Sequence, residues 1–320
     1  MLMFDERLDE EHAAALEAIP PDLLDLSDIP KARAVADGLL EAMADMIPDI
    51  PGVTAADHFA PGPAGAPDVM VRVHRPDHLE GDLPALYWIH GGGMVLGKVD
   101  WDDTTCKMLA LAGDCVVASV EYRLAPEHPH PAPVEDCYAG LRWFSFNAPA
   151  LDVDAGRIAI GGASAGGGLA AALALLVRDR GEIDLAWQML IYPMIDDRNV
   201  TNSSHYVTHP QVWNRAANLA GWNALLDGRA GEPDVSPYAA AARAEDVSGL
   251  PPAYIAVGEL DLFLDEDIDY AQRLLAAGVP TELHVYPKAF HGSDTFAPMT
   301  ATSQQWIEDR NAALRAALHG

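Results

Sequence analysis

Hydrophobic positions in the first 50 residues recur at intervals of three and four among acidic residues. The spacing of Leu16, Ile19, Leu23 and Leu26 predicts amphipathic helices, because such intervals place apolar side chains on one helical face. A stretch of proline, glycine and alanine over residues 61–67 then predicts a loop.

From residue 69 onward, short apolar runs alternate with helical patterns. The runs predicted as strands are Val69–His74, Ala85–Ile89, Cys115–Glu121, Arg157–Gly161, Trp187–Tyr192, Ala253–Val257 and Thr281–Tyr286. Helical patterns lie between most of them, at Thr104–Ala112, Val134–Phe146, Ala165–Arg178 and Asp265–Ala277. Short buried strands that alternate with helices are typical of a parallel sheet covered on both faces.

Residues 195–250 interrupt this alternation. They contain one helical pattern, Val212–Leu226, and no clear strand. We interpret them as an insertion that packs with the N-terminal helices over the carboxyl edge of the sheet.

Composition narrows the class of protein. Half of the 320 residues are hydrophobic, which suffices for a large core and excludes a disordered or fibrous chain. The chain has 20 basic and 48 acidic residues, a formal charge of −28, so it should repel nucleic acids and anionic membrane surfaces. Its longest apolar stretch, Leu169–Val177, falls far short of the ~20 residues that span a bilayer.

The cysteines and the N-terminus predict a cytoplasmic location. Cys106, Cys115 and Cys137 are an odd number without the spacing of a disulfide framework, which favours a reducing compartment. The first residues are acidic where a signal peptide would have a basic start.

The strongest chemical motif is Gly162-Ala163-Ser164-Ala165-Gly166. It follows the apolar run at residues 157–160 and opens a helical pattern, the strand–turn–helix setting in which G-x-S-x-G exposes a nucleophilic serine. Small flanking residues fit the strained turn that projects the hydroxyl. The alternative interpretation is a glycine-rich helix start with an ordinary N-cap serine.

A second motif, His90-Gly91-Gly92-Gly93, directly follows the strand predicted at Ala85–Ile89. Glycines let main-chain N–H groups turn into a cavity where they can stabilise an oxyanion. We expect His90 to brace this loop rather than act as a base. The alternative is a flexible glycine turn.

A nucleophilic serine needs a base, and the base needs an acid that orients it. His291 lies in a loop after the last predicted strand, and Asp261 lies just past the strand at Ala253–Val257. Ser164, Asp261 and His291 follow the order of an α/β-hydrolase, and all lie beyond carboxyl ends of predicted strands. Glu259 and Asp265 remain alternatives for the acid.

Taken together, the motifs resemble those of the bacterial hormone-sensitive-lipase-like carboxylesterases. The matching segments are His90–Gly93, Tyr122–Glu127, Pro131–Asp136, Gly162–Gly167, Gly258–Asp261 and Phe290–Gly292. Members of this family usually have Asp or Thr before the nucleophile, where this chain has Ala163. The sequence Asp261-Leu262-Phe263 resembles the branch with G-T-S-A-G at the nucleophile.

The resemblance implies an α/β-hydrolase fold with a mostly parallel eight-stranded sheet, helices on both faces and a helical cap. Residues 1–50 and 195–230 would form the cap, and residues 51–194 and 231–320 the catalytic domain. It also implies that the main-chain N–H groups of Gly92, Gly93 and Ala165 form the oxyanion hole. Dimers are common in the family, so a homodimer is a candidate assembly, and the sequence leaves the oligomeric state open.

These features predict a serine carboxylesterase that cleaves short- to medium-chain, small-molecule esters through an acyl-enzyme. The alternatives are an amide or formamide hydrolase on the same triad and a non-catalytic ligand-binding protein. No cofactor is expected, and no metal, since His128-Pro-His130 lacks a further ligand at suitable spacing. Candidate substrate contacts are Trp213, Trp222 and Leu262, although buried tryptophans more often belong to a core.

Overall fold

One eight-stranded sheet forms the centre of the computed structural model, which describes residues 4–20, 23–43 and 49–320. Its strands are β1 (Val53–Ala60), β2 (Val69–Pro76), β3 (Leu83–Ile89), β4 (Val116–Val120), β5 (Val153–Ala163), β6 (Trp187–Ile191), β7 (Ala253–Gly258) and β8 (Thr281–Tyr286). The spatial order is β1-β2-β4-β3-β5-β6-β7-β8. Strand β2 runs antiparallel to both neighbours and the other pairs are parallel, which confirms the predicted mostly parallel sheet.

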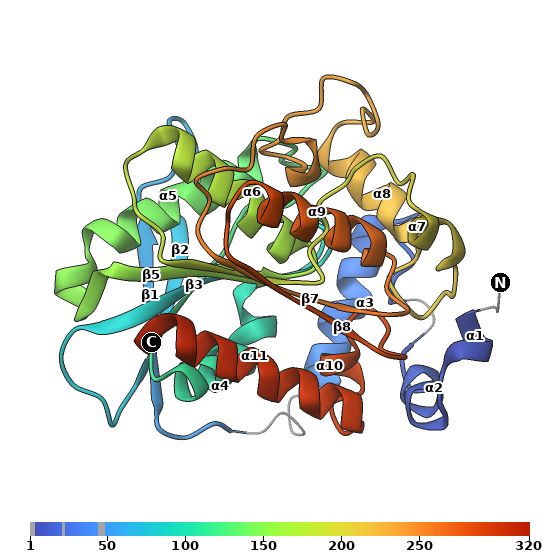
Figure 1. Cartoon of the computed structure of the whole chain (residues 1–320), viewed down its shortest axis with the longest axis horizontal. Coiled ribbons are helices and arrows are strands. Elements are labelled where there is room, and N and C mark those ends of the chain that lie inside the picture. The colour runs from blue at the N-terminus through green and yellow to red at the C-terminus, as the bar shows by residue number, and fades with distance from the viewer. Residues whose placement is uncertain (1–3, 21–22, 44–48) are drawn as a thin grey trace.

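Helices cover both faces of the sheet (Figure 1). Helices α5 (Ala132–Phe146), α6 (Ala165–Arg180) and α9 (Leu264–Ala276) lie on one face, and α4 (Asp103–Gly113) and α11 (Ala301–His319) on the other. The side chains of the strands divide accordingly into two buried hydrophobic clusters. This layered arrangement is the α/β-hydrolase architecture that the resemblance implied.

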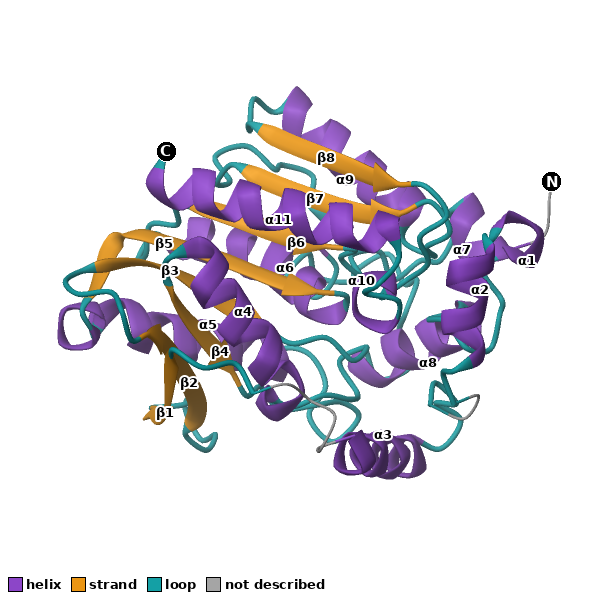
Figure 2. Ribbon diagram, turned by 90° about the horizontal axis from the view of Figure 1, so that it is seen from below, coloured by secondary structure: helices purple, strands orange, loops and turns teal. Residues whose placement is uncertain are grey.

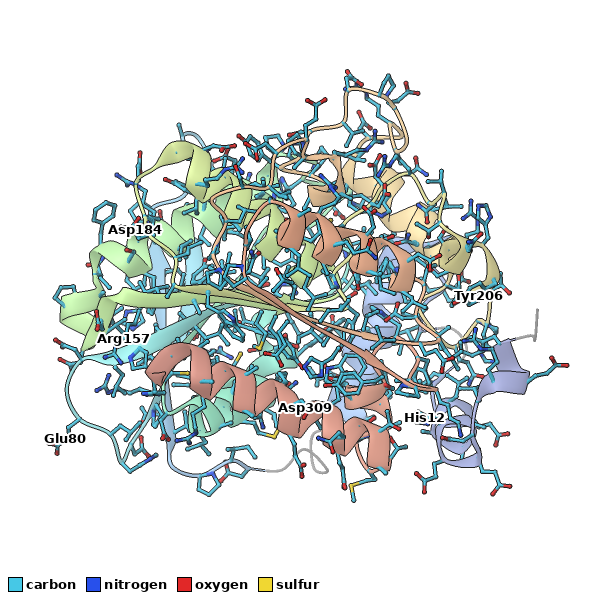
Figure 3. All side chains as sticks on the ribbon, in the orientation of Figure 1. His12, Glu80, Arg157, Asp184, Tyr206 and Asp309 are labelled. Carbon is cyan, nitrogen blue, oxygen red and sulfur yellow. The ribbon has the colours of Figure 1, made fainter. Side chains whose placement is uncertain are left out.

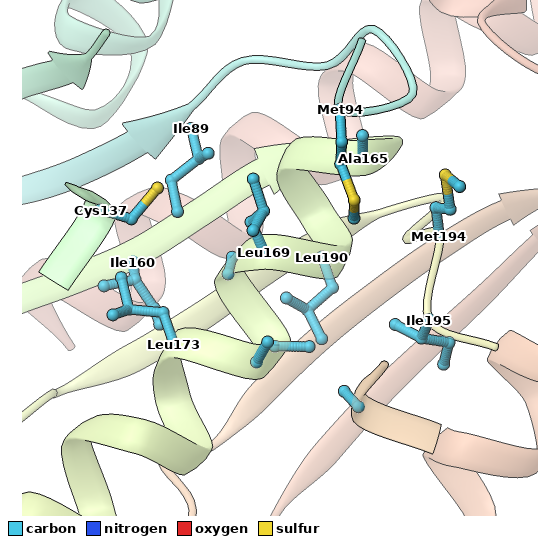
Figure 4. Close-up of a cluster of buried hydrophobic side chains, with 14 of the residues drawn as sticks. Ile89, Met94, Cys137, Ile160, Ala165, Leu169, Leu173, Leu190, Met194 and Ile195 are labelled. Atoms are coloured by element: carbon cyan, nitrogen blue, oxygen red, sulfur yellow. The ribbon is translucent and has the colours of Figure 1, made fainter. Parts of the chain in front are cut away.

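Helix α6 lies in the middle of the larger cluster. Every residue from Ala165 to Val177 is buried, as expected for a helix that is apolar on all sides. Figure 4 shows Leu169 and Leu173 of α6 among side chains of β5 and β6, including Ile160 and Leu190. The residues that follow Ser164 are therefore held in the best-packed part of the molecule.

The remaining helices gather beyond the carboxyl ends of the parallel strands (Figure 2). They are α1 (Phe4–Arg7), α2 (Glu10–Glu17), α3 (Ile29–Met43), α7 (Asn202–Tyr206), α8 (Arg215–Leu225) and the short α10 (Ser293–Phe296). Gln211 Nε2 donates hydrogen bonds to the carbonyl oxygens of Leu16 and Ile19, so the segment before α8 is tied to the N-terminal helices.

Several elements differ from the sequence predictions: helices α7, α10 and α11 were not predicted, and α8 and β1 differ for identifiable reasons. Helix α8 begins three residues later than predicted, because Asn214 caps it by accepting hydrogen bonds from the N–H groups of Ala216 and Ala217. Strand β1 was missed, because most of its side chains are exposed and its sequence lacks the alternation of a half-buried strand.

Many of the acidic residues that outnumber the basic ones lie on the surface. Glu80 and Asp184 project outward from exposed loops (Figure 3). The three cysteines are buried free thiols. Among the helices of the described ranges, none has the length and hydrophobicity needed to cross a membrane.

Candidate active site

Ser164 lies on a sharp turn between β5 and α6. Its backbone has φ 58° and ψ −123°, a strained conformation for a residue with a side chain. The turn is held from both sides, because the Ser164 N–H donates to the Ile191 carbonyl and the Ser164 carbonyl accepts from the N–H groups of Gly168 and Met194. This is the turn geometry that the G-x-S-x-G motif predicted.

The structure brings Ser164, His291 and Asp261 together in one hydrogen-bonded chain. The Ser164 Oγ lies 2.9 Å from His291 Nε2, and His291 Nδ1 lies 2.8 Å from Asp261 Oδ2. The other oxygen of Asp261 accepts a hydrogen bond of 2.9 Å from the N–H of Phe263, so both carboxylate oxygens have a donor. Asp261 is fully buried, whereas Ser164 and His291 retain 8 % and 9 % of their exposure, which leaves the hydroxyl and imidazole accessible.

The alternative acids are engaged elsewhere. Glu259 forms an ion pair with Arg7 and also accepts from the N–H of Lys288. Asp265 accepts from the N–H of Ser203. Of the three carboxylates that the sequence left open, the structure places Asp261 against His291.

Aromatic rings fix the orientation of the His291 imidazole. The rings of Tyr192 and Phe263 pack edge-on against it, with centroid separations of 4.6 Å and 5.2 Å. Rings at these separations and angles are in favourable contact. The imidazole is therefore held by packing as well as by its hydrogen bonds.

The glycine loop after β3 lies beside Ser164. Gly93 has φ +61°, and a Cβ there would lie 2.1 Å from the ring of Trp213, so only glycine fits. Among the described residues, the structure gives no hydrogen-bond acceptor to the N–H groups of Gly92, Gly93 and Ala165. Ala165 follows Ser164 at the first position of α6, where a helix leaves its N–H unpaired.

His90 packs against this loop and holds it in place. Its ring stacks on Tyr122 at a centroid separation of 4.2 Å, and its Nδ1 lies 2.8 Å from the carbonyl oxygen of Gly91. Burial lowers the pKa of His90 to about 4, so the ring is neutral at physiological pH. This geometry fits the bracing role expected for His90.

Ser164 and His291 line a cavity of about 220 Å³. Its wall is mostly apolar and comes from parts of the chain that lie far apart in sequence. They are the N-terminal segment, the glycine loop, the short helix Val99–Asp102, the turn at Ser164, Tyr192 after β6, the segment before α8, and the loop with His291 and α10. The lining includes Ile19, Leu23, Leu24, Ala36, Gly92, Leu96, Trp101, Asp102, Ser164, Tyr192, Val212, Trp213, His291 and Phe296.

The predicted substrate contacts lie in different places. Trp213 lines the cavity, and its Nε1 donates to the side chain of Asn218, which fixes the indole. Trp222 and Leu262 are fully buried and do not line the cavity, because Trp222 of α8 packs into the hydrophobic core and Leu262 is enclosed next to Asp261.

Several cavity residues were not found from the sequence. Asp102 stands in a run of acidic residues that resembles a solvated surface, and Tyr192 and Phe296 resemble ordinary core or loop positions. A weak signal was available for Asp102, because it follows the glycine loop by only nine residues and the chain must leave that loop close to the site.

Comparisons with known proteins agree with this geometry. The family described as having the alpha/beta hydrolase fold matches residues 86–295. The esterase LipI of Mycobacterium tuberculosis is 36% identical over 316 residues, covering 95% of this chain and 96% of LipI. Carboxylesterase NlhH of the same organism is 38% identical over 258 residues, covering 80% of each chain. A solved bacterial heroin esterase superposes with a TM-score of 0.94 at 44% identity, covering 98% of this chain and 99% of that one.

Proposed function

The chain belongs to the alpha/beta hydrolase family, in its hormone-sensitive-lipase-like group, and is a carboxylic ester hydrolase. From this premise we propose that it cleaves short- to medium-chain esters of small molecules with a Ser164–His291–Asp261 triad, through an acyl-enzyme. The hydrogen-bonded chain from Asp261 through His291 to Ser164, at a strained turn that opens on a cavity, carries the proposal.

In the first half of the reaction, the Ser164 Oγ attacks the ester carbonyl carbon while His291 Nε2 takes the hydroxyl proton. Asp261 holds the imidazole in the tautomer with a proton on Nδ1 and stabilises the imidazolium that forms. The N–H groups of Gly92, Gly93 and Ala165 donate to the oxyanion. His291 then gives its proton to the leaving alcohol, and the acyl group stays on Ser164.

In the second half, a water molecule replaces the alcohol. His291 takes a proton from this water, whose oxygen attacks the acyl carbon, and the same N–H groups stabilise the second oxyanion. Collapse of this intermediate returns the proton to Ser164 and releases the carboxylic acid.

The size of the cavity supports a small substrate. Its 220 Å³ is below the ~300–1,000 Å³ of pockets that enclose drug-sized ligands. An ester with a short or medium chain matches this space better than a long-chain lipid.

We also propose that residues 1–50 and 195–230 act as a cap over the cavity. Ile19, Leu23, Leu24 and Ala36 from the first segment and Val212 and Trp213 from the second contribute to its wall. Of the first segment, residues 1–3, 21–22 and 44–48 lie outside the described residues.

The test is Ser164→Ala, assayed with p-nitrophenyl butyrate. Loss of the nucleophile should lower kcat by at least ~10³-fold. Ser119→Ala is the matched control, because Ser119 is a buried serine of β4 outside the cavity. A fluorescent phosphonate should label the wild type and Ser119→Ala but not Ser164→Ala. Undiminished turnover by a folded Ser164→Ala variant would contradict the proposal.

A further inference from the structure

Asp102 places a carboxylate on the wall of the otherwise mostly apolar cavity that contains Ser164. It ends the short 3-10 helix Val99–Asp102 and directly precedes α4, but its side chain makes no capping hydrogen bond to that helix. Instead Oδ2 accepts a hydrogen bond of 2.6 Å from Trp88 Nε1. The carboxylate is thus fixed by one neutral donor while its residue faces the reactive space.

No cation of the described chain neutralises this carboxylate. The ion pairs found within residues 4–20, 23–43 and 49–320 do not include Asp102, although they include its neighbours Asp100 and Asp103. The charged group that acts on it is another acid, Asp294, which itself lies 3.5 Å from Arg310 and accepts from the Tyr192 hydroxyl. The two cavity histidines do not serve as counter-ions, because His90 is neutral and His291 must be neutral to act as a base.

Burial raises the pKa of Asp102 to about 6, although the Trp88 hydrogen bond opposes this rise. The group is therefore ionised at pH 8, and an anion that is partly shielded from water on a mostly apolar wall is costly without a counter-ion. A bound cation would remove that cost.

The other residues of the cavity wall also favour binding of a cation. Trp101, Tyr192, Trp213 and Phe296 bring four aromatic rings to the cavity. Aromatic faces attract ammonium groups, and this attraction grows when water is excluded. The formal charge of −28 also raises the concentration of cations near the protein.

We propose that Asp102 is a specificity-determining residue that selects esters bearing an ammonium group, either a protonated amine or a quaternary ammonium. The ammonium binds between the Asp102 carboxylate and the aromatic wall while the ester carbonyl lies at Ser164. This inference rests on the proposed esterase function and narrows its substrate class.

The experiment compares two matched pairs of esters at pH 8, where Asp102 is ionised. Acetylcholine and 3,3-dimethylbutyl acetate have the same shape and differ by a charge on the alcohol side. The p-nitrophenyl esters of 4-(trimethylammonio)butyrate and 5,5-dimethylhexanoate differ by a charge on the acyl side. The quantity measured is the ratio of kcat/KM for the charged ester to that for the neutral ester of each pair.

The variants are Asp102→Asn and Asp100→Asn. Asparagine keeps an oxygen that can accept from Trp88, so the first variant removes the charge and preserves the hydrogen bond. The second removes an equal charge two residues away, from a side chain that is 57% exposed, pairs with Arg72 and does not line the cavity.

We expect the wild type to favour the charged ester at least tenfold in one pair, Asp102→Asn to lose most of that preference, and Asp100→Asn to retain it. A ratio near one in both pairs, or a preference that survives in Asp102→Asn, would overturn the assignment and leave the esterase proposal intact. If none of the four esters is hydrolysed, the esterase proposal is overturned, and the proposed substrate class with it.

Discussion

The turn at Ser164 and the helix α3 both contribute to the cavity, yet their packing differs sharply. A Cβ on Gly166, two residues after Ser164, would lie 2.0 Å from the carbonyl oxygen of Ile89 and 2.5 Å from that of His90. A Cβ on Gly38, in the middle of α3, would meet no heavy atom within 4 Å. The backbone of α6 therefore touches that of β3, whereas one side of α3 faces open space.

Acidic side chains are also more deeply buried near the turn at Ser164 than in the N-terminal segment. Close to Asp261, Glu266 and Asp267 are buried carboxyls of α9. In the N-terminal segment, Asp25 and Asp28 between α2 and α3 and Asp37 on α3 are exposed or only partly covered. Arg33 attaches α3 to the rest of the molecule by donating to the carbonyl oxygens of Val95 and Ala125.

This contrast indicates that the turn at Ser164 and the N-terminal part of the cavity wall differ in their tolerance for substitution. Main-chain carbonyls accept both hydrogen bonds of Gln211 and two of those of Arg33, whose others go to the Glu127 carboxylate. Side chains around these contacts other than Glu127 can therefore vary without breaking them. Around Gly166 a single methyl group has no room. Substitutions in the two regions measure how far this difference extends.

The largest effect is expected for Gly166→Ala. The added methyl group would collide with two carbonyl oxygens of the main chain, so we expect destabilisation of about 3 kcal/mol. The glycine loop and the turn at Ser164 would be pushed apart, and phosphonate labelling of Ser164 should be lost. Urea denaturation and the labelling rate check both effects, and a variant with wild-type values would show that the packing is looser than described.

An intermediate effect is expected for Asp267→Asn. Burial raises the pKa of Asp267 well above its ordinary range, and the charge of Glu266 adds to the rise. Within the described residues neither carboxyl oxygen has a hydrogen-bond partner. The folded chain thus retains a proton that the unfolded chain has lost, so the free energy of unfolding falls as pH rises from about 4 towards the folded pKa.

Asparagine removes this proton uptake. The stability of Asp267→Asn relative to wild type should therefore improve by about 2 kcal/mol between pH 5 and pH 8, measured by denaturant unfolding at both values. Asp269→Asn, on the exposed side of α9, is the control and should show no such trend. A pH-independent difference for Asp267→Asn would mean that the carboxyl is solvated.

The smallest effect, and one of opposite sign, is expected for Gly38→Ala. The site is helical and has space for a methyl group, and alanine in a helix interior is more stable than glycine by about 0.5–1 kcal/mol. The melting temperature should rise slightly and the kcat for p-nitrophenyl butyrate should stay at the wild-type value. Destabilisation would instead show that α3 is packed as tightly around Gly38 as the turn at Ser164 is around Gly166.

The sequence was most informative where local chemistry and burial agree. The apolar run of β5, the glycines around Ser164 and the apolar residues of α6 each favour the same strand–turn–helix, so the fold of this part followed from the sequence. Strand β1 could not be predicted in this way, because it is an edge strand with mostly exposed side chains and depends on pairing with β2 for its conformation.

The cavity wall was the least predictable part of the candidate site. Trp213 was expected on a helix and instead precedes α8, held by Asn218 and by its contact with Gly93. Asp102 was not identified, because it stands among other acidic residues and its local sequence does not indicate the hydrogen bond between its carboxylate and Trp88. Such positions depend on tertiary contacts between segments far apart along the chain, which hydrophobic periodicity does not encode.

The cavity takes its wall from both ends of the chain, from Ile19 and Leu23 near the start to His291 and Phe296 near the end. During translation the N-terminal segment is synthesised first, and the cavity is complete only after the residues near the C-terminus have been added. A chain that ends before residue 291 therefore lacks both the proposed base and part of the cavity wall.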